Sequence, residues 1–135
     1  MAFWILKTEP TSYGFETLAA EKTARWDGVS NPVALKNIRA MRKGDEVMIY
    51  HTGDEKAVIG LATATSDGYP DPNDKAGKLA VVDLKAGKKL ARPVTLAEIK
   101  AEPLFAESPL VRQPRLSVGP ATDAQWKRLL KMAEG

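Results

Sequence analysis

Few residues of this sequence could carry out catalysis. Among its 135 residues there is one histidine, His51, and no cysteine. These counts exclude disulfides, thiolate zinc sites, iron–sulfur clusters, cysteine nucleophiles and any metal site built from several histidines. A hydrolytic triad would have to use His51, yet no G-x-S-x-G pattern supplies a nucleophile, and the glycine-rich phosphate-binding patterns are also absent. We therefore expect no catalytic residue, no metal and no cofactor.

Three segments place polar or aromatic residues at the end of a predicted element. Residues 7–10 (Lys-Thr-Glu-Pro) follow an apolar strand, residues 26–31 (Trp-Asp-Gly-Val-Ser-Asn) lead into a helix, and residues 50–52 (Tyr-His-Thr) end a strand. A tryptophan beside a helix N-terminus can stack on a planar ligand, or it can close the hydrophobic core. A lone histidine at a strand end is most often a structural hydrogen-bonding partner.

The pattern of elements predicts an α+β fold whose short strands form a small, strongly bent sheet or barrel. Helices are inserted between the strands without the strict alternation of a doubly wound parallel sheet. The strands are predicted over residues 2–7, 46–51, 56–65, 79–84, 90–94 and 113–118. A turn at Ala86-Gly87 would make the fourth and fifth strands a hairpin, and residues 68–77 read as a loop.

The helix starts are the clearest local signals. Asn31 followed by Pro32 predicts an N-cap with proline at the first helical position. Thr95 and Thr122 each begin a capping box, so a helix should follow each of them. A short helix is also predicted over residues 11–20, with its first residue as the N-cap.

The composition is that of an ordinary globular protein with a mild positive charge. Hydrophobic residues make up 44% and charged residues 27%, and the mass of 14.7 kDa fits one domain over residues 1–135. The net charge is +3, and the positive excess lies toward the two ends of the chain because acids gather within residues 67–74. No apolar run is long enough for a signal peptide or a membrane span. We expect a cytoplasmic monomer without membrane contact.

Four segments together resemble the EVE domain family of the PUA-like superfamily. They are residues 3–10, 26–31, 49–52 and 112–118, which follow the order and spacing of that family. The resemblance extends from Trp4 to Met132 and implies a PUA-like bent β-barrel of five to six strands with short helices at its ends. It also implies a pocket that receives a single base, often a modified one, flipped out of DNA or RNA.

The resemblance implies roles for individual residues. Trp26 would be the stacking wall of the base pocket. The rim of the pocket would be formed by Gly28, Val29 and Asn31, and its mouth by Lys7 and Thr8. The far wall would be formed by Tyr50, His51, Arg115, Leu116 and Ser117. Phosphate contacts are expected from Lys36, Arg39, Lys43 and Arg112. Ser30, Pro32 and Pro114 depart from the residues usual in the family, which bears on the ligand more than on the fold.

Simple energetics favour a reader of modified bases. Flipping a base out of a duplex costs a few kcal/mol, stacking on an aromatic ring returns about 1–3 kcal/mol, and phosphate contacts add affinity that depends on salt. We therefore expect a non-enzymatic module whose partner is DNA or RNA. Two alternatives use the same pocket: an enzyme acting on a nucleotide with His51 as acid or base near Tyr50, and a small-molecule sensor without phosphate contacts.

Overall fold

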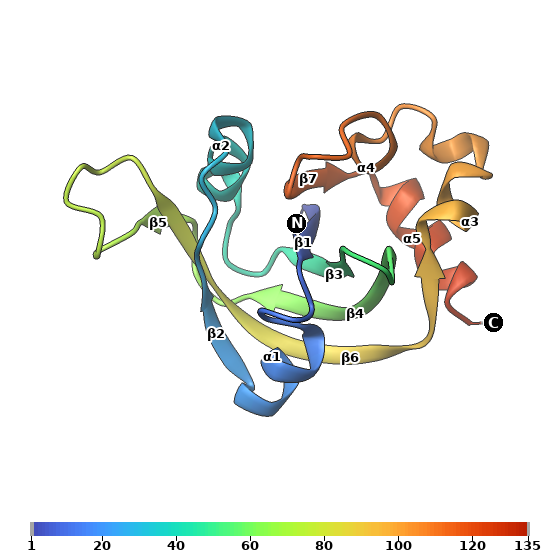
Figure 1. Ribbon diagram of the computed structural model, residues 1–135, viewed down its shortest axis with the longest axis horizontal. Coiled ribbons are helices and arrows are strands. Elements are labelled where there is room, and N and C mark those ends of the chain that lie inside the picture. Colours follow the sequence, from blue (N-terminus) through green and yellow to red (C-terminus); the bar gives the residue numbers. More distant parts are fainter. Residues whose placement is uncertain (1, 135) are drawn as a thin grey trace.

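A strongly bent, mixed β-sheet is the centre of the computed structural model, which describes residues 2–134 (Figure 1). Its strands are β1 (Phe3–Thr8), β2 (Thr23–Trp26), β3 (Glu46–His51), β4 (Ala57–Ala64), β5 (Tyr69–Pro70), β6 (Ala80–Thr95) and β7 (Val118–Ala121). They follow the order β2-β6-β4-β3-β1-β7, with β5 paired to β6. Within residues 2–134, β1 and β3 pair in parallel and the other strand pairs are antiparallel. The predicted α+β class is confirmed, and the sheet ends at β2 and β7 without closing into a complete barrel.

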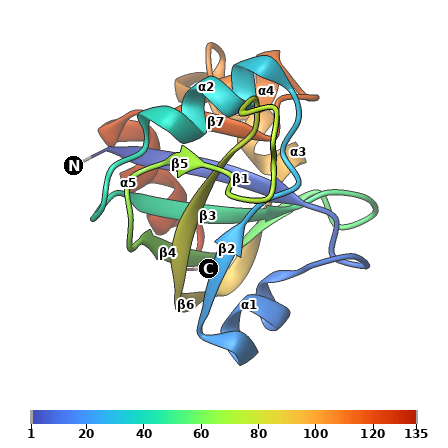
Figure 2. The same cartoon turned by 90° about the vertical axis from the view of Figure 1, so that its left-hand side faces the viewer.

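The helices pack against both faces of this sheet (Figures 1 and 2). They are α1 (Phe15–Glu21), α2 (Pro32–Ala40), α3 (Leu96–Lys100), the 3-10 helix η1 (Pro103–Phe105), α4 (Pro109–Arg112) and α5 (Asp123–Met132). Neighbouring residues of a strand point to opposite faces. Trp4 and Leu6 of β1 therefore enter the core beneath α1 and α2, whereas Ile5 enters the second core, beneath α3 to α5.

The helix caps predicted from the sequence are confirmed. The Oδ1 atom of Asn31 accepts hydrogen bonds from the N–H groups of Val33 (2.9 Å) and Ala34 (3.1 Å) at the start of α2. Thr95 and Thr122 each complete a reciprocal capping box at the start of α3 and α5. Each capping hydrogen bond joins residues no more than four positions apart, so it can form wherever the chain begins a helix.

The first helix begins later than predicted. It starts at Phe15 after Gly14, and residue 11 caps nothing. The carbonyl of Glu9 accepts hydrogen bonds from the N–H groups of Ser12 and Tyr13, so the chain makes a turn before it enters the helix. The start of α1 is instead set by a tertiary contact: the N–H of Phe15 donates to the ring of His51.

The hairpin predicted at Ala86-Gly87 is wrong, because both predicted strands belong to the continuous, 16-residue β6. A Cβ atom at Gly87 would lie 2.9 Å from the carbonyl oxygen of Leu61 on β4. The pairing of β4 with β6 shifts register on either side of Gly60. The glycine thus permits a close approach between two strands rather than a turn.

The last predicted strand is displaced along the chain. Residues 113–117 form a loop, and β7 begins at Val118, the final residue of the predicted strand. Within the loop the N–H of Leu116 donates to the carbonyl of Gln113, which turns the chain before β7. Among residues 2–134, no helix combines the length and apolar composition needed to cross a bilayer.

Candidate functional site

The parallel pairing of β1 with β3 brings two of the chemically distinctive segments together. In this register Lys7 lies beside Tyr50, and Thr8 lies beside His51. Parallel strands end at the same edge of a sheet, so the polar residues that close both strands meet there. The ammonium group of Lys7 lies 5.5 Å from the centre of the Tyr50 ring. Burial lowers the pKa of Lys7 and raises the pKa of Tyr50.

The loop of residues 113–117 is held on this edge by Lys7. The backbone N–H of Lys7 donates to the carbonyl of Ser117 (2.8 Å), and its ammonium group donates to the carbonyl of Pro114 (2.9 Å). Residues 115–117 therefore lie close to the ends of β1 and β3. The hydroxyl of Thr8 is engaged elsewhere, since it donates to the carbonyl of Tyr13.

Two hollows lie on either side of this loop. The first, of about 310 Å³, separates the loop from the start of α2 and is lined by Asn31, Val33, Gln113, Pro114, Arg115 and Leu116. The second, of about 290 Å³, is lined by Lys7, Tyr50, Thr52, Gly53, Lys56, Leu96, Lys100, Leu110 and Pro114. Ligand pockets usually measure roughly 300–1,000 Å³, so each hollow suits a small group such as a base or a phosphate.

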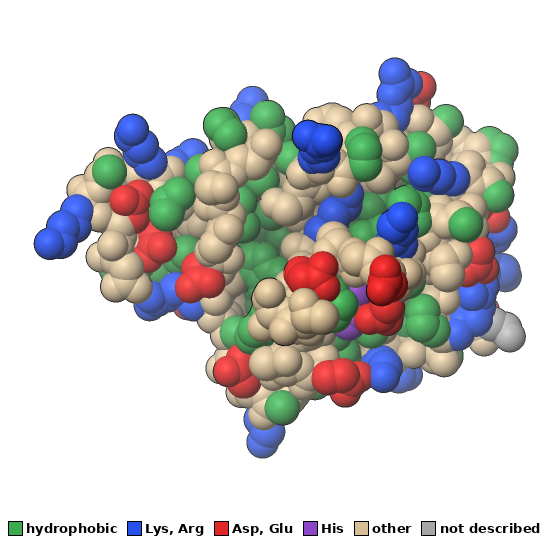
Figure 3. Space-filling view, viewed as in Figure 1, with side chains coloured by type: hydrophobic (Ala, Val, Ile, Leu, Met, Phe, Trp, Pro, Cys, Tyr) green, Lys and Arg blue, Asp and Glu red, His purple; other side chains and the backbone are tan. Residues whose placement is uncertain are grey.

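The surface around these elements is basic. In the view of Figure 3, Lys and Arg side chains spread over the region of α3, α4 and the start of β7. Hydrophobic side chains form the floor of a depression between that region and the side of the molecule that carries β2 and α2. Acidic side chains gather below the depression, toward α1.

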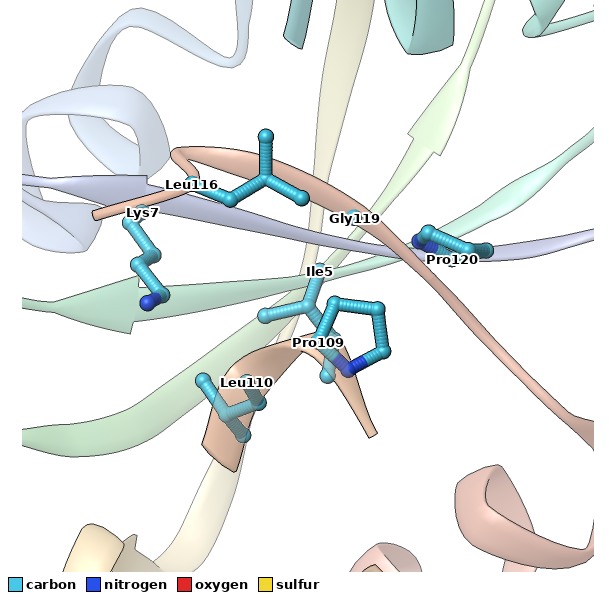
Figure 4. Close-up of a pocket in the computed structure, with 7 residues that line it drawn as sticks. All are labelled: Ile5, Lys7, Pro109, Leu110, Leu116, Gly119 and Pro120. Carbon is cyan, nitrogen blue, oxygen red and sulfur yellow. The ribbon is translucent and has the colours of Figure 1, made fainter. Parts of the chain in front are cut away.

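A third cavity lies beneath the loop and is too small for a ligand. It measures about 10 Å³, which is room for about one water molecule. In Figure 4 the side chains of Ile5, Leu110 and Leu116 converge on it, while the amine of Lys7 points away. The same small space separates α4 from β1 and β7, so we interpret it as a packing gap.

Trp26, the last residue of β2, and Val29 in the loop that follows lie in the core, whereas Gly28 lies at the surface. Trp26 is 6% exposed and packs edge to face on Tyr13, with 5.8 Å between the ring centres. Gly28 has a φ of +78°, in the left-handed region that glycine adopts readily. In this structure Trp26 closes the core and offers little surface to a ligand, so its role as a stacking wall stays a prediction.

His51 has a structural role that accounts for both ring nitrogens. Its Nε2 atom accepts a hydrogen bond from the N–H of Phe15 (2.9 Å), and its Nδ1 atom lies 2.8 Å from Oε1 of Glu55. Because Nε2 accepts, we assign the ring proton to Nδ1, which donates to Glu55. His51 is 5% exposed and packs against Gly14. With both ring nitrogens engaged, the expected contact of His51 with a base, and its alternative use as an acid or base, stay predictions that this arrangement does not support.

Replacing His51 by alanine should therefore destabilise the start of α1. The N–H of Phe15 would lose its acceptor while buried, which costs about 1–3 kcal/mol in unfolding free energy. Urea unfolding and amide exchange of Phe15 would measure this loss. Glu55→Gln is the control, since it leaves the bond from Phe15 intact and should cost less. Unchanged stability of the alanine variant would contradict the structural role.

Two of the four expected phosphate contacts are exposed on α2. Lys36 points to solvent, and Arg39 also lies at the surface, where its guanidinium donates to the carbonyl of Lys78. Arg112 is exposed at the end of α4 but binds the carboxylate of Glu107 at 2.8 and 2.9 Å. This ion pair neutralises much of the charge that Arg112 would offer to a phosphate.

Lys43 does not belong to the same site as Asn31. It follows the C-terminal end of α2, whereas Asn31 caps the N-terminal end. A nine-residue helix is about 14 Å long, so the helix itself separates the two residues. Lys43 thus lies at the opposite end of α2 from Asn31, and its expected contact with phosphate stays a prediction.

Several residues that line the hollows had no signal in the sequence. Lys56 lies in a turn before β4 and Lys100 ends α3, and no motif or spacing connects either of them with Lys7. Gln113 and Val33 are neighbours of predicted residues but were not singled out. Among residues 2–134, no group of three or more His, Cys, Asp or Glu side chains could hold a metal ion.

Known proteins resemble this chain over nearly its full length. The EVE domain family model matches residues 2–132. Human thymocyte nuclear protein 1 is 30% identical over 166 aligned residues, which cover 97% of this chain and 73% of that protein. An NMR structure of a Rhodopseudomonas palustris protein has a TM-score of 0.93 and 40% identity, covering 99% of this chain and 94% of that chain.

A ligand-bound structure is among the similar ones. The crystal structure of human THYN1 protein in complex with 5-methylcytosine-containing DNA has a TM-score of 0.90 and 28% identity, covering 100% of this chain and 99% of that chain. The match of the family model extends across every helix and strand described above. This chain therefore belongs to the EVE domain family.

Proposed function

We propose that this protein is a non-enzymatic module that binds nucleic acid and holds one modified base in the hollow between α2 and residues 113–117. The observation that carries this proposal is the similarity of the whole chain, at a TM-score of 0.90, to human THYN1 protein bound to DNA that contains 5-methylcytosine. The first candidate ligand is therefore 5-methylcytosine in DNA. Other modified bases, and RNA, are further arms of the test.

The chemistry of the hollow suits the edge of a pyrimidine. The Oδ1 atom of Asn31 already caps α2, which leaves the NH₂ of its amide as a donor toward a ligand. Arg115 adds guanidinium donors, and the N-terminal end of α2 adds a partial positive charge. Cytosine presents its O2 and N3 atoms as acceptors. Leu116 and Val33 give the hollow apolar walls that a methyl group can contact.

The finer part of the proposal is that the base leaves its stack and packs on Trp26. The ring of Trp26 is buried in the free protein and packs against Tyr13. Stacking therefore requires the chain around the ring to move, and the adjacent Gly28 has a backbone that tolerates such a change. Stacking would contribute about 1–3 kcal/mol, enough to offset most of the cost of flipping.

Binding of labelled duplexes, followed by fluorescence anisotropy, tests the proposal with the variant Asn31→Ser. Serine caps a helix about as well as asparagine, so α2 should keep its stability while the amide donor is lost. We expect the wild type to prefer a duplex with one 5-methylcytosine over the same duplex with cytosine. In the variant the affinity for the methylated duplex should fall by about fivefold or more, the loss of one specific base contact of about 1–3 kcal/mol, while the preference for the methyl group, which Leu116 and Val33 would contact, is retained.

The control is Asn73→Ser, an exposed asparagine in the loop between β5 and β6, which should leave both affinity and preference unchanged. A parallel arm compares Trp26→Phe, which keeps an aromatic ring, with Trp26→Leu, which does not. Matching RNA duplexes and duplexes with modified adenine complete the panel. A wild type that binds none of these at low salt would refute the proposed function, and an Asn31→Ser variant that binds the methylated duplex as tightly as the wild type would refute the role of Asn31.

A further inference from the structure

Three lysines from separate parts of the chain converge on the hollow of about 290 Å³. Lys7 belongs to β1, Lys56 precedes β4, and Lys100 ends α3. The N–H of Leu96 donates to the carbonyl of Lys56 at 2.7 Å, which ties the turn before β4 to the start of α3. The positions of the lysines are therefore set by backbone contacts rather than by flexible surface loops.

The charge of these lysines is not neutralised within residues 2–134. None of the three forms an ion pair there, whereas Lys89, Arg92, Arg112 and Arg128 are each paired with a glutamate. No carboxylate lines the hollow. Two acids lie beside it: Glu55 binds His51, and the carboxylate of Glu9 accepts a long hydrogen bond from Thr52 at the rim and lies against Gly53.

The backbone of Lys56 is strained in a way that favours a functional role. Its φ is +44°, and Lys22 is the other non-glycine residue within 2–134 that has a positive φ. An L-residue in this region costs about 1–2 kcal/mol. Strain of this kind persists where surrounding contacts hold it, and it concentrates at ligand sites. Here the bond from Leu96 holds Lys56 on the rim of the hollow.

We infer that this hollow binds a phosphate group, which in the nucleic-acid complex is a phosphodiester next to the captured base. The inference rests on the proposed function for the identity of the ligand but not for the anion site itself. Pro114 lines both hollows, so a single loop separates the phosphate from the base. Lys56 and Lys100 at the rim and the half-buried Lys7 provide the donors.

Contacts to phosphate carry no sequence information, so loss of this site should weaken binding to every duplex alike. Each such contact contributes about 0.9 to the slope of the logarithm of the binding constant against the logarithm of salt concentration. The double variant Lys56→Ala/Lys100→Ala removes two exposed side chains, so folding should be retained. We expect its slope to fall by about 1–2, with an equal loss of affinity for methylated and unmethylated duplexes.

The matched control is Lys127→Ala/Lys131→Ala, which removes the same net charge from exposed positions on α5. If the slope falls equally in both double variants, or in neither, the inference is overturned. A second arm uses inorganic phosphate and follows backbone amides by NMR. Shifts at Thr52, Gly53 and Lys56 that disappear in Lys56→Ala/Lys100→Ala support the anion site even if no nucleic acid binds, and the absence of shifts refutes it.

Discussion

Replacing Gly68 with alanine is expected to lower the free energy of unfolding by about 3 kcal/mol or more. A Cβ atom at this position would lie 1.9 Å from the carbonyl oxygen of Ile38 and 3.0 Å from Cα of Arg39. Both atoms belong to the backbone of α2, which cannot rotate out of the way as a side chain can. The N–H of Gly68 also donates to the carbonyl of Met41, so a shift of this segment would break a second contact.

The matched comparison for this variant is Gly77→Ala. Gly77 has a φ of +70° but no neighbour within 4 Å of a new Cβ atom, so alanine there should cost only the backbone strain, about 1–2 kcal/mol. Chemical denaturation of both variants measures the difference. If Gly68→Ala were no more destabilised than Gly77→Ala, the close packing of this segment on α2 would be refuted.

Replacing Asp45 with alanine should also cost about 3 kcal/mol, through loss of a buried carboxylate. Asp45 is 4% exposed and accepts three hydrogen bonds, from the N–H of Ala2 (3.0 Å), the indole N–H of Trp4 (2.9 Å) and the N–H of Arg42 (2.9 Å). Without the carboxylate these donors lose their acceptor where water has little access. Because they come from β1 and from the end of α2, the residue joins the first strand to the turn before β3. Calorimetry or urea unfolding measures the loss, and exposed Asp54→Ala, which should change stability by less than about 0.5 kcal/mol, is the control.

The contribution of Asp45 should depend on pH in a defined direction. Burial alone would raise the pKa of Asp45, but the three donors outweigh burial and hold the pKa below the usual 3.8. The unfolded chain then binds the proton more tightly than the folded one. The stabilisation is complete above about pH 4 and disappears as the pH falls through the lowered pKa. The stability difference between wild type and Asp45→Asn should therefore shrink in acid, and a difference that grew would contradict this assignment.

The features that could be predicted from the sequence are those that depend on near neighbours. The caps at Asn31, Thr95 and Thr122 need a side-chain oxygen and a backbone N–H within four residues, so the residue types at those positions are enough to predict the helix starts. The strand at residues 46–51 was predicted with its observed bounds because a glycine-containing turn precedes an apolar run. Membership of the EVE domain family was likewise visible, since four motifs keep their order along the chain.

The surroundings of a residue could not be predicted where they depend on a partner far away in the sequence. Gly87 looks like a turn residue, but the carbonyl of Leu61 on the adjacent strand is what excludes a side chain there. For His51 the sequence left a structural role and a ligand-binding or catalytic role open, and in the structure its ring nitrogens contact Phe15 and Glu55. For Trp26 the sequence left open a stacking ring or a core position, and in the structure Tyr13 packs against the buried ring. None of these partners is implied by local sequence.

In the candidate site, too, the residue types could be predicted from the sequence but their neighbours could not. The neighbours of Asn31 in its hollow, and the three lysines of the adjacent one, come from segments far apart in the chain. Their meeting depends on the parallel pairing of β1 with β3 and on Lys7 holding residues 113–117. The amino-acid sequence alone thus established the local elements, the family and the residue types available for binding. Which of those residues share a hollow was settled by strand pairing and packing, because contacts between distant segments form only when the whole sheet buries its two cores.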